Sequence, residues 1–139
     1  NIIVNKCLSP VGYNEDKIKF YVCGDRDACG RMGEKYFVNE EPNGKIIDVE
    51  CIQLNELLKI YNIKHVDFFS VDVEGAELDL LDSIDFSSDV YFKEILIEIH
   101  HHIEDRICYI KENYSKIFNI EIIKCSQTHV KLRNIDDKH

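Results

Sequence analysis

Apolar residues gather in short runs along this chain, and polar or turn-forming positions bound each run. Runs that are apolar nearly throughout predict strands covered on both faces, as in a parallel sheet, and alternating runs predict half-buried strands. The final two runs enclose a short polar turn and predict an antiparallel hairpin. The predicted strands are residues 2–8, 18–22, 66–72, 95–99, 120–123 and 129–132.

Helical spacing appears between these strands. One amphipathic face has apolar residues at positions i, i+3, i+4 and i+7, and these are Leu54, Leu57, Leu58 and Tyr61. Residues 78–84 predict a short helix that turns Leu80, Leu81 and Ile84 inward. The clearest helical stripe follows, and it predicts a core-facing helix: Ile103, Ile107, Ile110, Tyr114 and Ile117.

The first third of the chain carries turn signals. Residues 42–44 read Pro-Asn-Gly between two apolar segments and predict a hairpin or an ordered excursion over residues 36–49. Residues 24–34 are glycine-rich and charged but lack the G-x-G-x-x-G spacing, so they predict a surface loop. Strands that alternate with helices predict an α/β protein with a mainly parallel sheet and a terminal antiparallel hairpin. We expect one domain over residues 1–139.

Composition narrows the class of protein further. The formal charge of −9 and dispersed lysines argue against binding to nucleic acid, which needs clustered basic residues. The sequence contains no apolar run of membrane-spanning length, so we expect a cytoplasmic protein without a membrane partner. The six cysteines are irregularly spaced and form no C-x-x-C pair, which favours free thiols over a zinc or disulfide framework.

Two carboxylates follow the apolar run at residues 66–71. Asp72 and Glu74 lie where this strand ends, and Gly75 allows a tight turn into the next helix. Ligands of open α/β sheets bind outside the carboxyl ends of the strands. Asp72 is therefore a candidate to orient or deprotonate a hydroxyl group, or to hold a divalent cation. The alternative is that Asp72 caps the following helix, and the helix dipole alone favours Glu77 in the first turn.

A second candidate group ends the strand at residues 95–99. Glu98 and His100 share one side of this strand by the two-residue period, and together they could supply a base or two metal ligands. His101 and His102 are interpreted as bystanders. Because parallel strands end together, we predict that Asp72, Glu74, Glu98 and His100 cluster at one sheet edge. We assign no metal ligand, although a divalent cation remains open.

The segment Val-Asp-Phe-Phe-Ser-Val-Asp-Val-Glu-Gly-Ala-Glu-Leu at residues 66–78 resembles the D-x-E-G-x-E stretch of the FkbM family of S-adenosylmethionine-dependent methyltransferases. Residues 49–58 and 95–100 resemble the family's segments on either side, and residues 1–9 resemble the strand before its adenine-side loop. The resemblance implies a Rossmann-like class I methyltransferase sheet, S-adenosylmethionine as cofactor, and O-methylation of a small molecule or sugar.

The resemblance also implies site residues. Asp72, Glu74 and His100 would be catalytic, and Leu8, Ser9 and Asp72 would contact the cofactor. One departure is Ser70, where the family usually has a lysine. Another is that the family's glycine-rich cofactor loop and ribose-binding acid would both precede Asn1.

From this second departure we expect a chain that lacks the N-terminal strands of its domain and binds S-adenosylmethionine weakly. Two other functions stay open. The chain could be a truncated or degenerate methyltransferase-like module with a binding or structural role. It could also be a phosphatase with a strand-end aspartate, although Glu74 and Ala76 depart from the D-x-D-x-T pattern of that class.

Overall fold

The two most apolar runs lie side by side as parallel strands in the computed structural model, which describes residues 2–9, 13–22, 31–32, 45–73 and 75–136. Strand β6 (Phe69–Val71) pairs in parallel with β8 (Glu94–Ile99). Upstream, β5 (His65–Val66) pairs with β7 (Tyr91–Phe92) in the same direction. The prediction that these two runs are neighbouring strands is confirmed, although the run at residues 66–72 is divided between β5 and β6.

The C-terminal hairpin completes the larger sheet. Strands β9 (Phe118–Lys124) and β10 (Thr128–Asn134) pair antiparallel, and β10 also pairs antiparallel with β8. The resulting strand order is β6-β8-β10-β9. The predicted α/β class and the closing hairpin are therefore confirmed. The sheet is mixed rather than mainly parallel, because β10 inserts between β8 and β9.

A second sheet has the order β1-β4-β2-β3. Its strands are β1 (Cys7–Leu8), β2 (Lys17–Val22), β3 (Arg31–Met32) and β4 (Lys45–Ile52). Strand β4 runs parallel to β1 and antiparallel to β2. Of the predicted hairpin over residues 36–49, residues 36–44 lie outside the described part, and β4 pairs with β2. Most of the predicted loop at 24–34 also lies outside it, and residues 31–32 form β3.

The prediction of a buried strand at residues 2–8 is wrong for most of its length. Only Cys7 and Leu8 pair with β4, and Ile2 and Ile3 are 64% and 92% exposed. An apolar run becomes a buried strand only where another strand and a packed face receive it. Here Leu8 packs against the core, whereas Ile2 and Ile3 stand away from it.

The cysteines that the structure describes are free thiols, as predicted: Cys7, Cys51, Cys108 and Cys125. Cys7 and Cys51 face one another in the β1–β4 register. Burial and the neighbouring Cys51 thiol raise the pKa of Cys7, and burial and then Asp16 raise the pKa of Cys51. Both thiols are therefore held in their protonated, less nucleophilic form.

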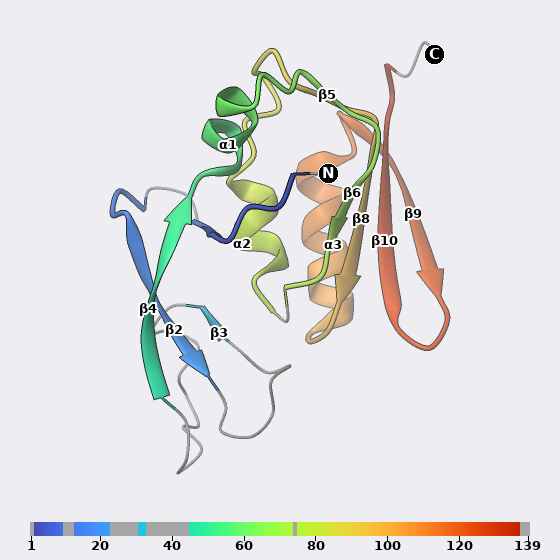
Figure 1. The fold of residues 1–139 in the computed structure, drawn as a ribbon. Helices are drawn as coiled ribbons and strands as arrows, with labels where there is room; N and C mark the ends of the chain where they lie inside the picture. The colour runs from blue at the N-terminus through green and yellow to red at the C-terminus, as the bar shows by residue number, and fades with distance from the viewer. Residues whose placement is uncertain (1, 10–12, 23–30, 33–44, 74, 137–139) are drawn as a thin grey trace.

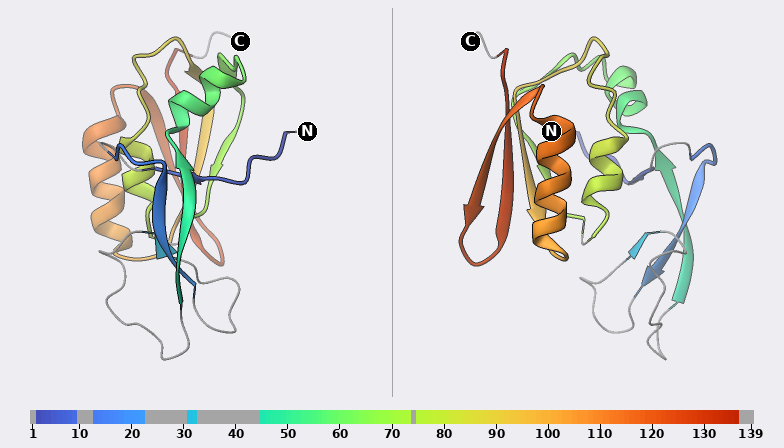
Figure 2. Two further views of the ribbon diagram at one scale, coloured as in Figure 1. Left: turned by 60° about the vertical axis from the view of Figure 1, so that its left-hand side comes forward. Right: turned by 180° about the vertical axis from the view of Figure 1, so that it is seen from behind.

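Three helices accompany the sheets: α1 (Leu54–Ile60), α2 (Glu77–Asp82) and α3 (Ile103–Tyr114). Helices α2 and α3 lie next to each other on one face of the larger sheet (Figures 1 and 2). The predicted inward positions of α2 and the C-terminal half of α3 are buried there. Tyr61 is exposed because α1 ends at Ile60. No helix in the described part of the chain is long and apolar enough to cross a membrane.

The core forms between this face and the two helices. Alternate residues of β8 point into it, and Ile95, Ile97 and Ile99 are almost fully buried. The Phe86 ring makes edge-on contacts with Phe92 and Phe118, within the 4.5–7 Å range of favourable aromatic pairs. The residues between these isoleucines, Leu96 and Glu98, point to the other side of β8. The Glu98 side chain therefore lies outside the core.

Asp82, the last residue of α2, ties this helix to α3. Its carboxylate accepts hydrogen bonds from the hydroxyl groups of Tyr109 and Tyr114. Burial and the bond to Asp82 raise the pKa of Tyr114 well above its ordinary value. In the exposed Tyr109, the bond to Asp82 and then burial raise the pKa.

This arrangement predicts a dependence of stability on alkaline pH. A tyrosine whose pKa is raised by folding contributes stability below its unfolded pKa of 10.0, and this contribution is lost as pH rises beyond that value. Tyr114→Phe should lower the free energy of unfolding by about 1.5 kcal/mol at neutral pH. It should also flatten the decline of stability between about pH 9 and pH 11. Urea unfolding at several pH values measures both effects, and Tyr109→Phe is the control with a smaller expected change. Equal slopes in wild type and Tyr114→Phe would contradict the assignment.

Candidate functional site

The carboxyl ends of β6 and β8 bring an aspartate and a histidine together. Val71 pairs with Ile97 in the parallel ladder, so Asp72 and His100 both lie just beyond the ends of neighbouring strands. His100 Nε2 is 3.6 Å from Asp72 Oδ1. Asp72 itself is 59% exposed, whereas the His100 side chain is only 12% exposed. The predicted meeting of these two residues at one sheet edge is confirmed.

Glu98 joins them from the side of β8 that faces away from the core. Glu98 Oε1 is 3.4 Å from His100 Nε2. Its other oxygen, Oε2, is 3.5 Å from Nε2 of His129, which is the register partner of Glu98 on β10. His129 carried no signal in the sequence, because its place depends on the pairing of two strands about thirty residues apart. The site therefore extends across β6, β8 and β10.

Glu77 of helix α2 contacts the His100 ring at its other nitrogen, Nδ1. Its side chain is fully buried, and Oε1 lies 3.1 Å from His100 Nδ1. The same oxygen accepts a hydrogen bond of 2.7 Å from the Gly75 backbone N–H. The helix dipole favours an acid in the first turn of α2, but the sequence did not indicate that this acid would be buried against a histidine.

Arg106 of α3 neutralises the buried carboxylate. Its Nη1 donates to Glu77 Oε2, and its Nη2 donates to the Gly75 carbonyl oxygen at 3.0 Å. The guanidinium group thus clamps the start of α2 to α3. Nothing in the sequence indicates this role of Arg106, because an arginine beside an apolar helical stripe normally faces solvent.

The geometry rules out one of the two interpretations of Asp72, and its functional role stays a prediction. Helix α2 has Ala76 as its N-cap residue, with no side-chain hydrogen bond to the cap. The alternative that Asp72 caps this helix is therefore wrong, and Glu77 instead reaches back to Gly75. Glu74 lies outside the described residues, so its predicted place in the cluster and its catalytic role stay predictions.

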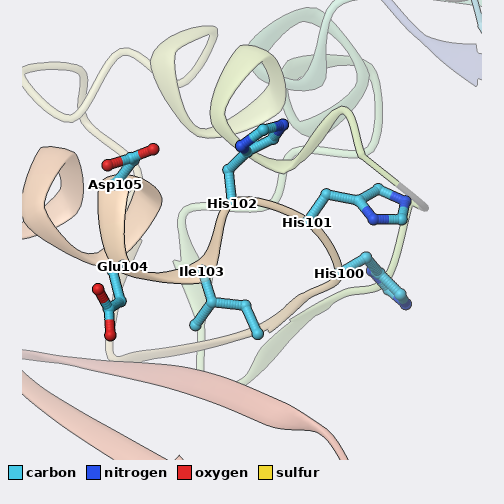
Figure 3. A pocket seen from close by; sticks show the side chains of 6 residues that line it. All are labelled: His100, His101, His102, Ile103, Glu104 and Asp105. Atoms are coloured by element: carbon cyan, nitrogen blue, oxygen red, sulfur yellow. The ribbon is translucent and has the colours of Figure 1, made fainter.

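An open hollow of about 610 Å³ lies beside the site, along the turn from β8 into α3. His100 and His101 lie toward one end of it, and Glu104 and Asp105 lie toward the other (Figure 3). His102 has a φ of 49°, a left-handed conformation in which the chain turns into α3. His101 and His102 are exposed. In the described part of the chain, the group of potential metal-binding residues is Asp72, Glu98 and His100, without these two histidines.

The residues predicted on the cofactor side lie at the end of β1. Leu8 is packed against the core, and Ser9 is buried. The Ser9 backbone N–H already donates a hydrogen bond of 3.0 Å to the Ile52 carbonyl oxygen. Contact between these residues and a cofactor stays a prediction.

Gly75 forms the turn that brings Glu77 into contact with His100. Its φ of 115° lies in a region that residues with a side chain rarely adopt, and a Cβ atom added there would meet nothing within 4 Å. Gly75→Ala should therefore lower the free energy of unfolding by about 1 to 3 kcal/mol through backbone strain alone. Chemical denaturation measures this loss. A loss below about 0.5 kcal/mol would mean that the turn can relax without cost.

The site can do two kinds of chemistry. Glu77 accepts hydrogen bonds from Gly75 and Arg106 and is placed to accept another from His100 Nδ1. The other ring nitrogen faces two carboxylates at the edge of the protein. A histidine held in this way can take up and pass on a proton, or it can bind a cation together with the acids.

Comparison with known proteins identifies the family of the chain. The model of the methyltransferase FkbM domain matches residues 4–135, which is nearly the whole chain. No curated protein and no solved structure matches the chain. The family match includes both strands that carry the site, β6 and β8. The chain therefore belongs to the FkbM methyltransferase domain family.

Proposed function

We propose that this protein transfers the methyl group of S-adenosylmethionine to an oxygen atom of a small molecule or sugar. Family membership supports methyl transfer. The observation that carries the proposal is the grouping of Asp72, Glu98 and His100 at the carboxyl ends of two parallel strands. This is the edge of an α/β sheet at which ligands bind.

Oxygen methylation needs a hydroxyl group aligned with the methyl donor and relieved of its proton. Asp72 is the most exposed of the three residues and would accept a hydrogen bond from the acceptor hydroxyl. His100 is less exposed than Asp72 and would share the proton of the acceptor hydroxyl through its Nε2 atom. Glu77 and Arg106 are positioning residues, because they hold the imidazole ring rather than touch the acceptor. Glu74 is proposed as a further catalytic acid.

The described residues fit the reacting end of S-adenosylmethionine better than its adenine end. Bound there, this donor supplies a methyl group on a cationic sulfur, and the acids of the site would face that positive charge. At the adenine end, Ser9 is buried and its N–H is already bonded to Ile52. The sequence also contains no G-x-G-x-x-G turn. We therefore assign Asp72, Glu98 and His100 to the acceptor side of the reaction.

We also propose that the larger sheet belongs to a methyltransferase fold. The parallel pair β6–β8, followed by the antiparallel strand β10, would form part of a Rossmann-like class I methyltransferase sheet. The open hollow beside His100 would receive the acceptor. Its lining is polar and charged on both sides of Ile103, which suits a hydroxylated molecule.

The experiment uses the protein expressed from its whole reading frame. S-adenosylmethionine with a ¹³C-labelled methyl group is incubated with the protein and a panel of sugars and small alcohols. NMR then identifies the atom that receives the label, and calorimetry measures donor binding. We expect labelled O-methyl products. Label on nitrogen or carbon would overturn the oxygen assignment. A bound donor without transfer to any acceptor would favour the alternative of a non-catalytic, methyltransferase-like module.

A further inference from the structure

We propose that Asp72, Glu98 and His100 bind a divalent transition-metal ion, of which Zn²⁺ is the best match. The three residues present one nitrogen and two oxygen donors within 4.8 Å of one another. They come from the ends of β6 and β8, so the core that packs these strands together also fixes the spacing of the donors.

The distances suit a small ion. His100 Nε2 lies 3.6 Å from Asp72 Oδ1 and 3.4 Å from Glu98 Oε1. Ligands at 2.0–2.2 Å from a tetrahedral zinc ion are separated from each other by about 3.3 to 3.6 Å. The two His100 distances fit a tetrahedral ion, and the Asp72 and Glu98 donor atoms lie within 4.8 Å of each other.

The residues that contact His100 and Glu98 from outside the donor group are a second observation that indicates a metal site. Metal-binding histidines usually donate their other ring N–H to a carboxylate, which fixes the ring and makes the free nitrogen a better ligand. Glu77 is fully buried and lies 3.1 Å from His100 Nδ1, on the side of the ring opposite Asp72 and Glu98. On the other side of the site, His129 lies 3.5 Å from the second oxygen of Glu98.

The two nitrogens of the ring have separate contacts. Nδ1 lies 3.1 Å from the buried Glu77 carboxylate, and Nε2 lies within 3.6 Å of both Asp72 and Glu98. A metal ion at Nε2 would be attracted by both of these carboxylates. The experiment distinguishes a bound ion from direct hydrogen bonds between the ring and the two acids.

The donor set selects the class of ion. Mg²⁺ and Ca²⁺ prefer oxygen ligands alone, whereas imidazole nitrogen suits zinc and neighbouring transition metals. Three protein ligands leave the fourth tetrahedral position open, as in catalytic zinc sites. The exposure of Asp72 gives an ion access from solvent. An acceptor hydroxyl at the open position would lose its proton more readily. This last role rests on the proposed function, but binding of the ion does not.

The test is calorimetric titration of the metal-free protein with Zn²⁺, followed by the visible spectrum of the Co²⁺-substituted protein. We expect one tight site with the spectrum of a tetrahedral nitrogen and oxygen environment. Asp72→Asn and Glu98→Gln should each raise the dissociation constant at least about tenfold. The matched control is Asp67→Asn, because Asp67 pairs with His65 at 3.3 Å on the exposed surface. His101→Gln is the control for the neighbouring histidines, and both controls should leave the dissociation constant within about twofold.

If the protein binds zinc, two results would still overturn the proposed metal site. One is equal zinc affinity in the wild type and Asp72→Asn, an exposed position at which substitution leaves the core intact. The other is a cobalt spectrum dominated by thiolate ligands, which would place the ion at cysteines. A protein that binds zinc tightly but transfers no methyl group would refute the proposed function alone. Methyl transfer by a protein that binds no ion would refute the metal site alone.

Discussion

The Glu77→Ala variant is expected to unfold with a free energy about 3 to 5 kcal/mol lower than that of the wild type, because it breaks a buried ion pair on one side. The Glu77 carboxylate is fully buried, and Arg106 is only 16% exposed. Loss of the Glu77 carboxylate leaves the Arg106 guanidinium group and the Gly75 N–H without the acceptor that both of them use. Urea unfolding followed by circular dichroism measures the change.

Two controls separate this pair from a general effect of lost charge. Glu104→Ala removes an exposed acid from the first turn of α3 and should cost about 0.5 kcal/mol. In a double-mutant cycle, Arg106→Ala should cost less once Glu77 is absent, with a coupling of about 1 to 3 kcal/mol. A loss below about 1 kcal/mol for Glu77→Ala, or additive losses in the cycle, would show that solvent replaces the pair without difficulty.

The second large effect is expected for Asp72→Asn in methyl transfer. If Asp72 orients the acceptor hydroxyl and shares its proton, the amide should lower kcat about 10²- to 10⁴-fold. The affinity for S-adenosylmethionine should stay nearly unchanged, because the proposed role lies on the acceptor side. Steady-state rates with the best acceptor, together with calorimetry of the donor, measure the two quantities separately.

Asp67→Asn serves as the matched control for this prediction. Asp67 is 87% exposed and belongs to the same run of residues, but it pairs with His65 and not with His100. Its substitution should leave kcat within about twofold. Full activity in Asp72→Asn would remove Asp72 from the reaction. A large loss of donor affinity with unchanged kcat would assign it to the cofactor instead.

The sequence was sufficient to predict the strands that carry the site. Near-continuous apolar runs identified β6 and β8, and the rule that parallel strands end together placed Asp72 beside His100. The two-residue period placed Glu98 and His100 on the same side of β8, and their atoms lie 3.4 Å apart. These predictions succeeded because they depend on local pattern and on the direction of neighbouring strands.

Other features of the site depend on contacts between distant segments. Arg106 reaches Glu77 only because α3 packs beside α2, and His129 reaches Glu98 only because β10 inserts next to β8. Neither relation leaves a periodic signal in the sequence. The apolar run at residues 2–8 shows the converse limit. This run is apolar, but Ile2 and Ile3 have no buried face to pack against in the described part of the chain.

The most direct test of the account compares two adjacent histidines in the methyl-transfer reaction. His100 lies in the group with Asp72 and Glu98, whereas His101 is exposed and lies outside it. The rate of labelled methyl transfer is measured for His100→Gln and His101→Gln under the same conditions, with circular dichroism to confirm that both variants fold. At saturating acceptor, the account predicts a loss of about 10²-fold or more for His100→Gln. It predicts a change within about twofold for His101→Gln, because His101 lines the hollow but lies outside the reacting group. Equal rates in the two folded variants would contradict the claim that the ends of β6 and β8 form the reacting site.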